Sequence, residues 1–89
     1  MKYTIRFAPT AISQFTKLSR GIQIKVRDAL HLLADNPYPS GCVLLQSNHT
    51  FRRIFVDDYR VIYQVKKREL IILIVRKRLE KKYIRISGE

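Results

Sequence analysis

The sequence predicts an α+β fold: an N-terminal strand, a helical hairpin and then an antiparallel sheet, in the order β-α-α-β-β-β-β with a short C-terminal segment. Three observations predict it. Apolar and polar residues alternate over residues 2–7, apolar residues recur at helical spacing over residues 9–35, and a period of two returns from Cys42 onward. A chain that keeps its helices and most of its strands in separate runs is typical of α+β domains.

A change in apolar spacing marks the first strand and the first helix. The alternation at the N-terminus predicts a strand with one buried face. Pro9 then occupies a position where a helix can begin without losing a backbone hydrogen bond. The expected helix covers residues 9–19 and is broken by Gly21. The side chains expected to be buried are Tyr3, Ile5 and Phe7 from the strand and Ala11, Phe15 and Leu18 from the helix.

A second amphipathic helix is expected from Ile22 onward. Its apolar residues recur every three or four positions, which is the spacing of one helical face. The run Asn36-Pro37-Tyr38-Pro39-Ser40-Gly41 ends this helix and forms a loop. The two helices are expected to form an antiparallel hairpin that lies on the sheet. The apolar face of the second helix consists of Ile22, Val26, Ala29 and Leu33.

The second half of the chain predicts four strands joined by short turns. Residues 69–75 are apolar on both faces, which is typical of a strand in the middle of a sheet. The basic residues 76–85 predict a tail with one or two helical turns. The strands are expected at residues 43–46, 51–56, 59–65 and 69–75, with turns at residues 47–49, 57–58 and 66–68.

The run FRRIFVDDYRVIYQV, residues 51–65, contains the candidate site. If Asp57-Asp58 is a two-residue turn, residue 55 faces residue 60 and residue 53 faces residue 62. Arg53 and Arg60 then lie on one face as diagonal neighbours, and two adjacent cations are best tolerated with a phosphate between them. A three-residue turn would separate them, since a one-residue slip exchanges the faces. One face is expected to hold Ile54, Val56, Tyr59, Val61, Tyr63 and Val65 with Arg52 at its edge, and the other Phe51, Arg53, Phe55, Arg60, Ile62 and Gln64.

Composition narrows the function classes. The chain has 89 residues and is expected to be a single domain, 1–89. A net charge of +11, with 12 of the 18 basic residues from Arg52 onward, favours a polyanionic partner such as nucleic acid. One cysteine, Cys42, excludes an internal disulfide, and it lies too far in sequence from the two histidines to suggest a metal site. The longest apolar run, residues 70–75, is far shorter than the roughly 20 residues of a membrane span, so we expect a cytoplasmic protein without a membrane partner.

The order of elements and three motifs resemble the RelE/ParE superfamily of toxins from bacterial and archaeal toxin–antitoxin systems. The resemblance covers residues 2–84, and it implies the RelE-like microbial RNase fold. Each motif alone is weak evidence for the family, but their order and spacing together are specific. They are the loop Asn36-Pro37-Tyr38-Pro39, the acidic turn with its following strand Asp58-Tyr59-Arg60-Val61-Ile62-Tyr63, and the basic cluster Arg76-Lys77-Arg78 with Tyr83 beyond it.

The resemblance to RelE implies a chemistry and a role for four residues. RelE-type members are ribosome-dependent endoribonucleases that cut messenger RNA in the A site without a metal or cofactor, by attack of the 2′-hydroxyl on the adjacent phosphate. Arg60 resembles the arginine that stabilises the transition state, and Arg53 a basic residue that assists it. Arg78 resembles the second catalytic arginine, with Arg76 as the alternative for that role. Tyr83 resembles the terminal tyrosine that orients the base.

One position departs from the RelE pattern. Where RelE has a second basic residue two positions after Arg53, this chain has Phe55, and the general base is left unassigned. Some relatives use a Glu–His pair, but His49 and Glu80 do not fall at matching positions. The residues expected to bind RNA are Arg52, Phe55, Arg76, Lys77, Lys81 and Lys82.

Two other functions stay open at this point. The first is a ParE-like toxin that inhibits DNA gyrase and cuts nothing. The second is a basic module that binds RNA or the ribosome without activity. Both toxin functions imply a cognate, RelB-like antitoxin, whose acidic and apolar segment is expected to wrap the basic face, and the nuclease function adds the ribosome and messenger RNA as partners.

Overall fold

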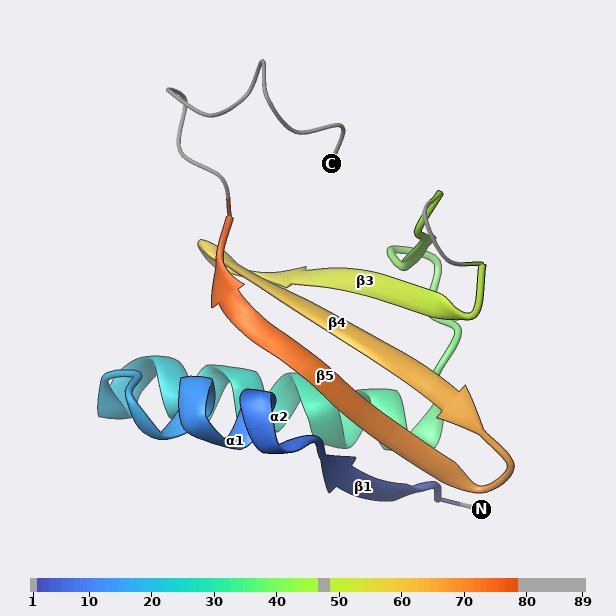
Figure 1. Cartoon of the computed structure of the whole chain (residues 1–89), viewed down its shortest axis with the longest axis horizontal. Helices are drawn as coiled ribbons and strands as arrows, with labels where there is room; N and C mark the ends of the chain where they lie inside the picture. Colours follow the sequence, from blue (N-terminus) through green and yellow to red (C-terminus); the bar gives the residue numbers. More distant parts are fainter. Residues whose placement is uncertain (1, 47–48, 79–89) are drawn as a thin grey trace.

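The computed structural model describes residues 2–46 and 49–78 (Figure 1). Five strands form one sheet in the order β1-β5-β4-β3-β2, with β1 parallel to β5 and the other neighbours antiparallel. This arrangement confirms the predicted α+β class and the predicted order of elements. The elements are β1 (Thr4–Phe7), α1 (Pro9–Thr16), α2 (Arg20–Asp35), β2 (Val43–Leu44), β3 (Phe51–Val56), β4 (Tyr59–Lys66) and β5 (Glu69–Lys77).

The break between the helices lies earlier than predicted. α1 ends at Thr16, and α2 begins at Arg20, so Gly21 lies in the first turn of α2 and does not break a helix. The cause is Ser19, whose side-chain oxygen accepts the backbone N–H of Ile22 at 3.4 Å and caps the new helix. Neither helix of the described residues is long and apolar enough to cross a lipid bilayer.

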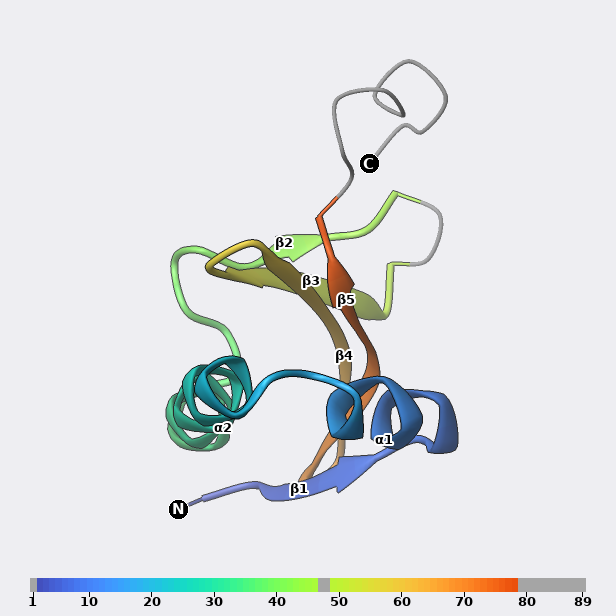
Figure 2. The same ribbon diagram turned by 90° about the vertical axis from the view of Figure 1, so that its left-hand side faces the viewer.

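The core joins both helices to one face of the sheet. In Figure 2 the two helices lie side by side, with β1 beneath them. Tyr63 of β4 is fully buried, and its hydroxyl donates a hydrogen bond to the carbonyl oxygen of Pro37 at 2.8 Å, which ties the loop after α2 to the sheet. The buried cluster consists of Ala11, Val26, Leu30, Leu33, Ala34, Val61, Tyr63, Leu70, Ile72 and Val75.

The β3–β4 hairpin has the predicted register. Phe55 faces Arg60 and Val56 faces Tyr59 across a two-residue turn, Asp57-Asp58. Asp57 adopts φ 54°, in the left-handed region that aspartate tolerates better than most residues. Because this turn has the expected length, the two faces of the hairpin are those predicted from the sequence.

The turn between β4 and β5 is shorter than predicted. Lys66 pairs with Glu69, so the turn consists of Lys67 and Arg68 alone. Lys67 adopts φ 58°, an unfavourable conformation for a lysine. Strand β2 is also shorter than expected and covers Val43–Leu44 instead of residues 43–46.

A β-bulge in β5 changes the pairing with β4. Tyr63 faces Ile72 but Ile62 faces Ile74, so Leu73 is an extra residue in β5. Beyond this point Arg60 faces Arg76, whereas an unbroken register would oppose it to residue 75. The strand continues to Lys77, so the predicted basic tail was wrong for its first two residues. The tail from residue 79 onward lies outside the described residues.

Helix α1 covers the open edge of β5. Strand β1 pairs with β5 only as far as Ile72. Further along, the backbone N–H of Val75 donates to Oε1 of Gln14 at 2.7 Å. A side chain of α1 therefore continues the hydrogen bonding of the sheet where β1 has ended.

Candidate functional site

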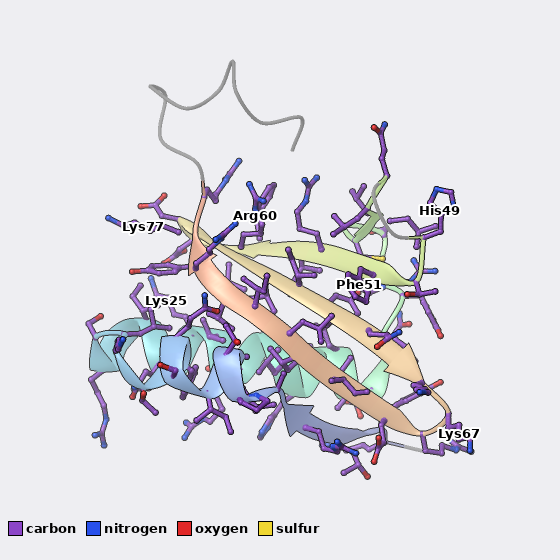
Figure 3. The ribbon with its side chains drawn as sticks, in the orientation of Figure 1. Lys25, His49, Phe51, Arg60, Lys67 and Lys77 are labelled. Carbon is purple, nitrogen blue, oxygen red and sulfur yellow. The ribbon has the colours of Figure 1, made fainter. Side chains whose placement is uncertain are left out.

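Four arginines gather on the sheet face directed away from the core. Alternation along the strands places Arg53 of β3, Arg60 of β4 and Arg76 of β5 on this face, and Arg78 follows β5 directly. Arg60 lies between Phe55, which faces it from β3, and Arg76, which faces it from β5. These four arginines and Phe55 are called the arginine face below. Figure 3 labels Arg60 where β3, β4 and β5 run side by side.

The Phe55 ring contacts two of these arginines. The guanidinium carbon of Arg78 lies 3.9 Å from the ring centroid, and that of Arg53 lies 4.8 Å from it. Both distances are within the range of cation–π attraction. Phe55 nevertheless remains 43% exposed. The ring therefore supports two cations and still offers part of its surface to a ligand.

Arg60 is buried, with 5% of its surface exposed. It lies on β4, between β3 and β5, and directly opposite another arginine, Arg76. Burial restricts the side chain to few rotamers and lowers the dielectric around its charge, so it attracts an approaching phosphate more strongly than a fully solvated arginine does. Like charges placed directly opposite each other also favour an anion between them.

Two residues expected to bind RNA lie on the other face of the sheet. Arg52 stacks over the ring of Tyr38 at 4.6 Å, and its Nη1 lies 3.5 Å from Sγ of Cys42. Lys77 faces Tyr59 and so shares the face of the buried core. Adjacent strand residues point to opposite faces, which separates Arg52 from Arg53 and Lys77 from Arg76.

The remaining predicted residues are His49 and four residues near the C-terminus. Tyr83, Lys81, Lys82 and Glu80 lie outside the described residues. His49 is exposed and lies at the far end of β3 from Arg60 (Figure 3). Within residues 2–46 and 49–78, no three His, Cys, Asp or Glu side chains are grouped so that they could hold a metal ion.

The carboxylate of Asp57 is directed away from Arg53. It accepts a hydrogen bond from Nζ of Lys25 in α2 at 2.7 Å, and this hydrogen bond raises the pKa of Lys25. A second ion pair, between Arg6 and Glu69 at 3.0 Å, lies at the opposite end of β5 from Arg76. Neither pair brings a negative charge to the arginine face.

An apolar groove borders the arginine face at Phe55. Strand β2 pairs only with Arg52 and Arg53 of β3, so the outer edge of β3 is open from Ile54 onward. The groove has a volume of about 570 Å³, and Leu32 at its rim is 72% exposed. Its lining consists of Ala29, Leu32, Leu33, Asp35, Asn36, Pro39, Gly41, Ile54 and Phe55.

Sequence reasoning found part of this site and missed three of its features. The stacking of Arg53 on Phe55 could have been found, since residues two apart in a strand share a face. The pairing of Arg60 with Arg76 depends on the bulge at Leu73, and the groove depends on the packing of α2 beside β3. Neither the Arg60–Arg76 pairing nor the groove can be recognised from the pattern of neighbouring residues in the sequence.

Comparison with known proteins places the chain among toxins. Residues 5–81 match the family model described as ParE toxin of type II toxin–antitoxin system, parDE. A RelE-like toxin protein of Escherichia coli is 28% identical over 76 residues, which are 84% of this chain and 80% of that protein.

Solved toxin structures share the fold. A mutant of E. coli RelE in complex with a peptide of the antitoxin RelB has a TM-score of 0.81 at 19% identity, covering 100% of this chain and 97% of that one. The toxin–antitoxin complex RelBE2 from Mycobacterium tuberculosis gives 0.76 at 26% identity, covering 88% of this chain and all of that chain. With the family-model match, these findings show that the chain belongs to the ParE toxin family of type II toxin–antitoxin systems, within the RelE/ParE superfamily.

Proposed function

We propose that this toxin is an endoribonuclease that cleaves messenger RNA in the ribosomal A site. The observation that carries the proposal is the arginine face, where buried Arg60 lies between Phe55 and Arg76 and two further arginines flank it. Phosphoryl transfer depends mainly on positioning and on cations directed at developing negative charge. A row of guanidinium groups on a rigid sheet provides both.

In the proposed reaction the RNA supplies its own nucleophile. The 2′-hydroxyl oxygen bonds to the adjacent phosphorus as the bond to the 5′-oxygen breaks, which leaves a 2′,3′-cyclic phosphate and a 5′-hydroxyl. Arg60 and Arg76 bind the phosphate oxygens, which gain negative charge in the transition state. Arginine stays protonated, so the protein contributes charge stabilisation here. The 2′-hydroxyl gives its proton to a group outside this face, and the departing 5′-oxygen takes a proton from solvent.

The remaining residues of the site have supporting roles in this proposal. Arg53 and Arg78 bind the flanking phosphates in this proposal, whereas the resemblance to RelE implies catalytic roles for both. Tyr83 orients the base, as that resemblance implies. Lys81 and Lys82 add attraction to the RNA backbone that does not depend on sequence.

The test is toxin-dependent cleavage of messenger RNA in a reconstituted translation reaction, mapped by primer extension. The variants are Arg76→Ala and Arg78→Ala, both exposed in the wild type, and Arg60→Lys, which keeps the charge of a buried residue. Arg27→Ala is the matched control, because it removes the same charge from an exposed position on α2.

Cleavage at A-site codons by wild type and Arg27→Ala, with a loss of about 10- to 1000-fold in the other three variants, would support the proposal. Thermal unfolding of each variant, followed by circular dichroism, separates loss of activity from loss of the fold. Equal cleavage by Arg76→Ala, Arg78→Ala and Arg27→Ala would contradict the assignment of this face.

Inhibition of DNA gyrase is the second candidate function. The observation that favours it is the match to the ParE family model over residues 5–81. A supercoiling assay with purified gyrase distinguishes the two functions. Inhibition of supercoiling together with no cleavage during translation would replace the nuclease proposal, and the arginine face would then be an interface with gyrase.

We propose that an acidic antitoxin segment with apolar side chains neutralises the toxin. Its apolar side chains would fill the groove beside Leu32, and its carboxylates would pair with the adjacent arginine face. Opposite charges on an exposed surface are screened by salt, so the affinity should fall as sodium chloride rises from about 50 to about 500 mM. Calorimetry with the cognate antitoxin tests this, and an affinity independent of salt would contradict it.

A further inference from the structure

The ring of Phe55 is the structural centre of the arginine face. It is the aromatic side chain on which the guanidinium groups of both Arg53 and Arg78 lie, at 4.8 and 3.9 Å. We propose that Phe55 is a positioning residue that holds these two cations beside Arg60 for catalysis. The proposal deepens the nuclease function above, and its effect on cleavage rests on that function.

The two arginines need such a support because of where they stand. Arg53 is near the edge of the sheet, and Arg78 is exposed just beyond the end of β5. Long side chains at such positions sample many rotamers in solvent, and ordering them on RNA binding would lower the affinity. Stacking on a fixed ring orders the guanidinium planes in advance, whereas the backbone alone fixes only their Cα positions.

The electrostatics explain why an aromatic ring is suited to this position. Four guanidinium groups already share the arginine face, and a fifth cation would add repulsion in the free protein. The face of an aromatic ring carries partial negative charge, so Phe55 attracts the cations around it. The phenylalanine at the position where RelE has a basic residue therefore gains a function of its own and is not simply a lost charge.

Cleavage kinetics test the catalytic part of this proposal. Phe55→Leu keeps an apolar side chain but removes the ring. It should lower kcat/KM about tenfold, through a higher KM because the arginines must be ordered when RNA binds, and through a lower kcat where they are misplaced beside Arg60. Phe55→Tyr keeps the ring and should retain the wild-type rate. Phe55→Lys restores the basic residue of RelE and should be no more active than Phe55→Leu. Leu44→Ala is the control, because Leu44 has the same 43% exposure but shares the face of Arg52.

The kinetic outcomes either support or overturn the proposal. Loss in Phe55→Leu and Phe55→Lys with retention in Phe55→Tyr supports it. Wild-type activity in Phe55→Leu, or a gain in Phe55→Lys, would overturn it, since the position would then be a defective cation site.

An NMR measurement tests the positioning itself without RNA or ribosomes. Protons near the face of an aromatic ring resonate upfield, so the Cδ protons of Arg53 and Arg78 should be shifted upfield in wild type and in Phe55→Tyr. In Phe55→Leu they should return to values typical of solvated arginine. Unshifted protons in the wild type would overturn the proposal. If the wild type cuts no RNA but these shifts are present, the nuclease function fails while the ordered arrangement of arginines stands.

Discussion

Replacing Tyr63 by phenylalanine tests the buried hydrogen bond that ties β4 to the loop after α2. The Tyr63 side chain is fully buried, and its hydroxyl donates to the carbonyl oxygen of Pro37 at 2.8 Å. Tyr63→Phe keeps the packing of the ring and removes this bond. A buried hydrogen bond contributes about 1 kcal/mol net, and the carbonyl left without its donor raises the loss toward about 2 kcal/mol. The free energy of unfolding should fall by this amount at pH 7.

This penalty should disappear at alkaline pH. Burial is the main cause that raises the pKa of Tyr63 in the folded protein. The resulting stability is fully present below the unfolded-state pKa of about 10 and is lost as the pH rises toward the folded-state value. At pH 11 the ionisation of Tyr63 in the unfolded state lowers the free energy of unfolding of the wild type by about 1.4 kcal/mol. Phenylalanine has no hydroxyl to ionise, so the variant does not lose this stability. The two proteins should therefore be nearly equal in stability at pH 11, and the variant should be the more stable one at pH 12.

Urea unfolding at several pH values between 7 and 12, followed by circular dichroism, measures this difference. The two proteins differ only in the hydroxyl group of residue 63, so the difference between wild type and Tyr63→Phe isolates that group. The reasoning would be refuted by a difference that stays constant over this range, because the Tyr63 hydroxyl would then be equally accessible to solvent in the folded and unfolded states.

Two further substitutions test the edge of β5 and its turn. Gln14→Ala should lower the free energy of unfolding by about 1–3 kcal/mol, because the buried N–H of Val75 loses its acceptor. Gln14→Glu retains an acceptor and should stay close to wild type at pH 7; equal stability of both variants would contradict the role of this bond. Lys67→Gly should be more stable than Lys67→Ala by about 0.5–1 kcal/mol in the same assay, since φ 58° strains any residue with a Cβ. A glycine variant no more stable than the alanine variant would show that the turn carries no such strain.

The β3–β4 hairpin could be predicted because its turn fixes its register. Asp57-Asp58 separates two apolar runs by two residues, and the faces of both strands follow from that length. The same turn length is sufficient to predict that Arg53 and Arg60 share one face. Chain composition, by contrast, indicates only that the partner carries negative charge.

The end of β5 could not be predicted, for a physical reason. Residues 70–75 are all apolar, so there is no alternation of apolar and polar residues whose interruption would reveal an extra residue. The position of the bulge is set by packing on both sides of the sheet, and it decides the face on which Arg76 lies. Ser19 is a different case, because a serine three residues before Ile22 is a capping signal that the sequence does contain.

The bulge at Leu73 has a consequence for genetic variation in this toxin. The extra residue determines on which face of the sheet each side chain lies from the bulge to the end of β5. Deleting one codon at the bulge would only remove the extra residue and leave Arg76 opposite Arg60. Inserting one codon directly after Val75 would instead turn Arg76 and Arg78 toward the core side of the sheet. Such an allele would encode every arginine of the wild type and still lack half of the arginine face. Toxin genes that lose activity in this way would retain all of the residues by which their activity is usually judged.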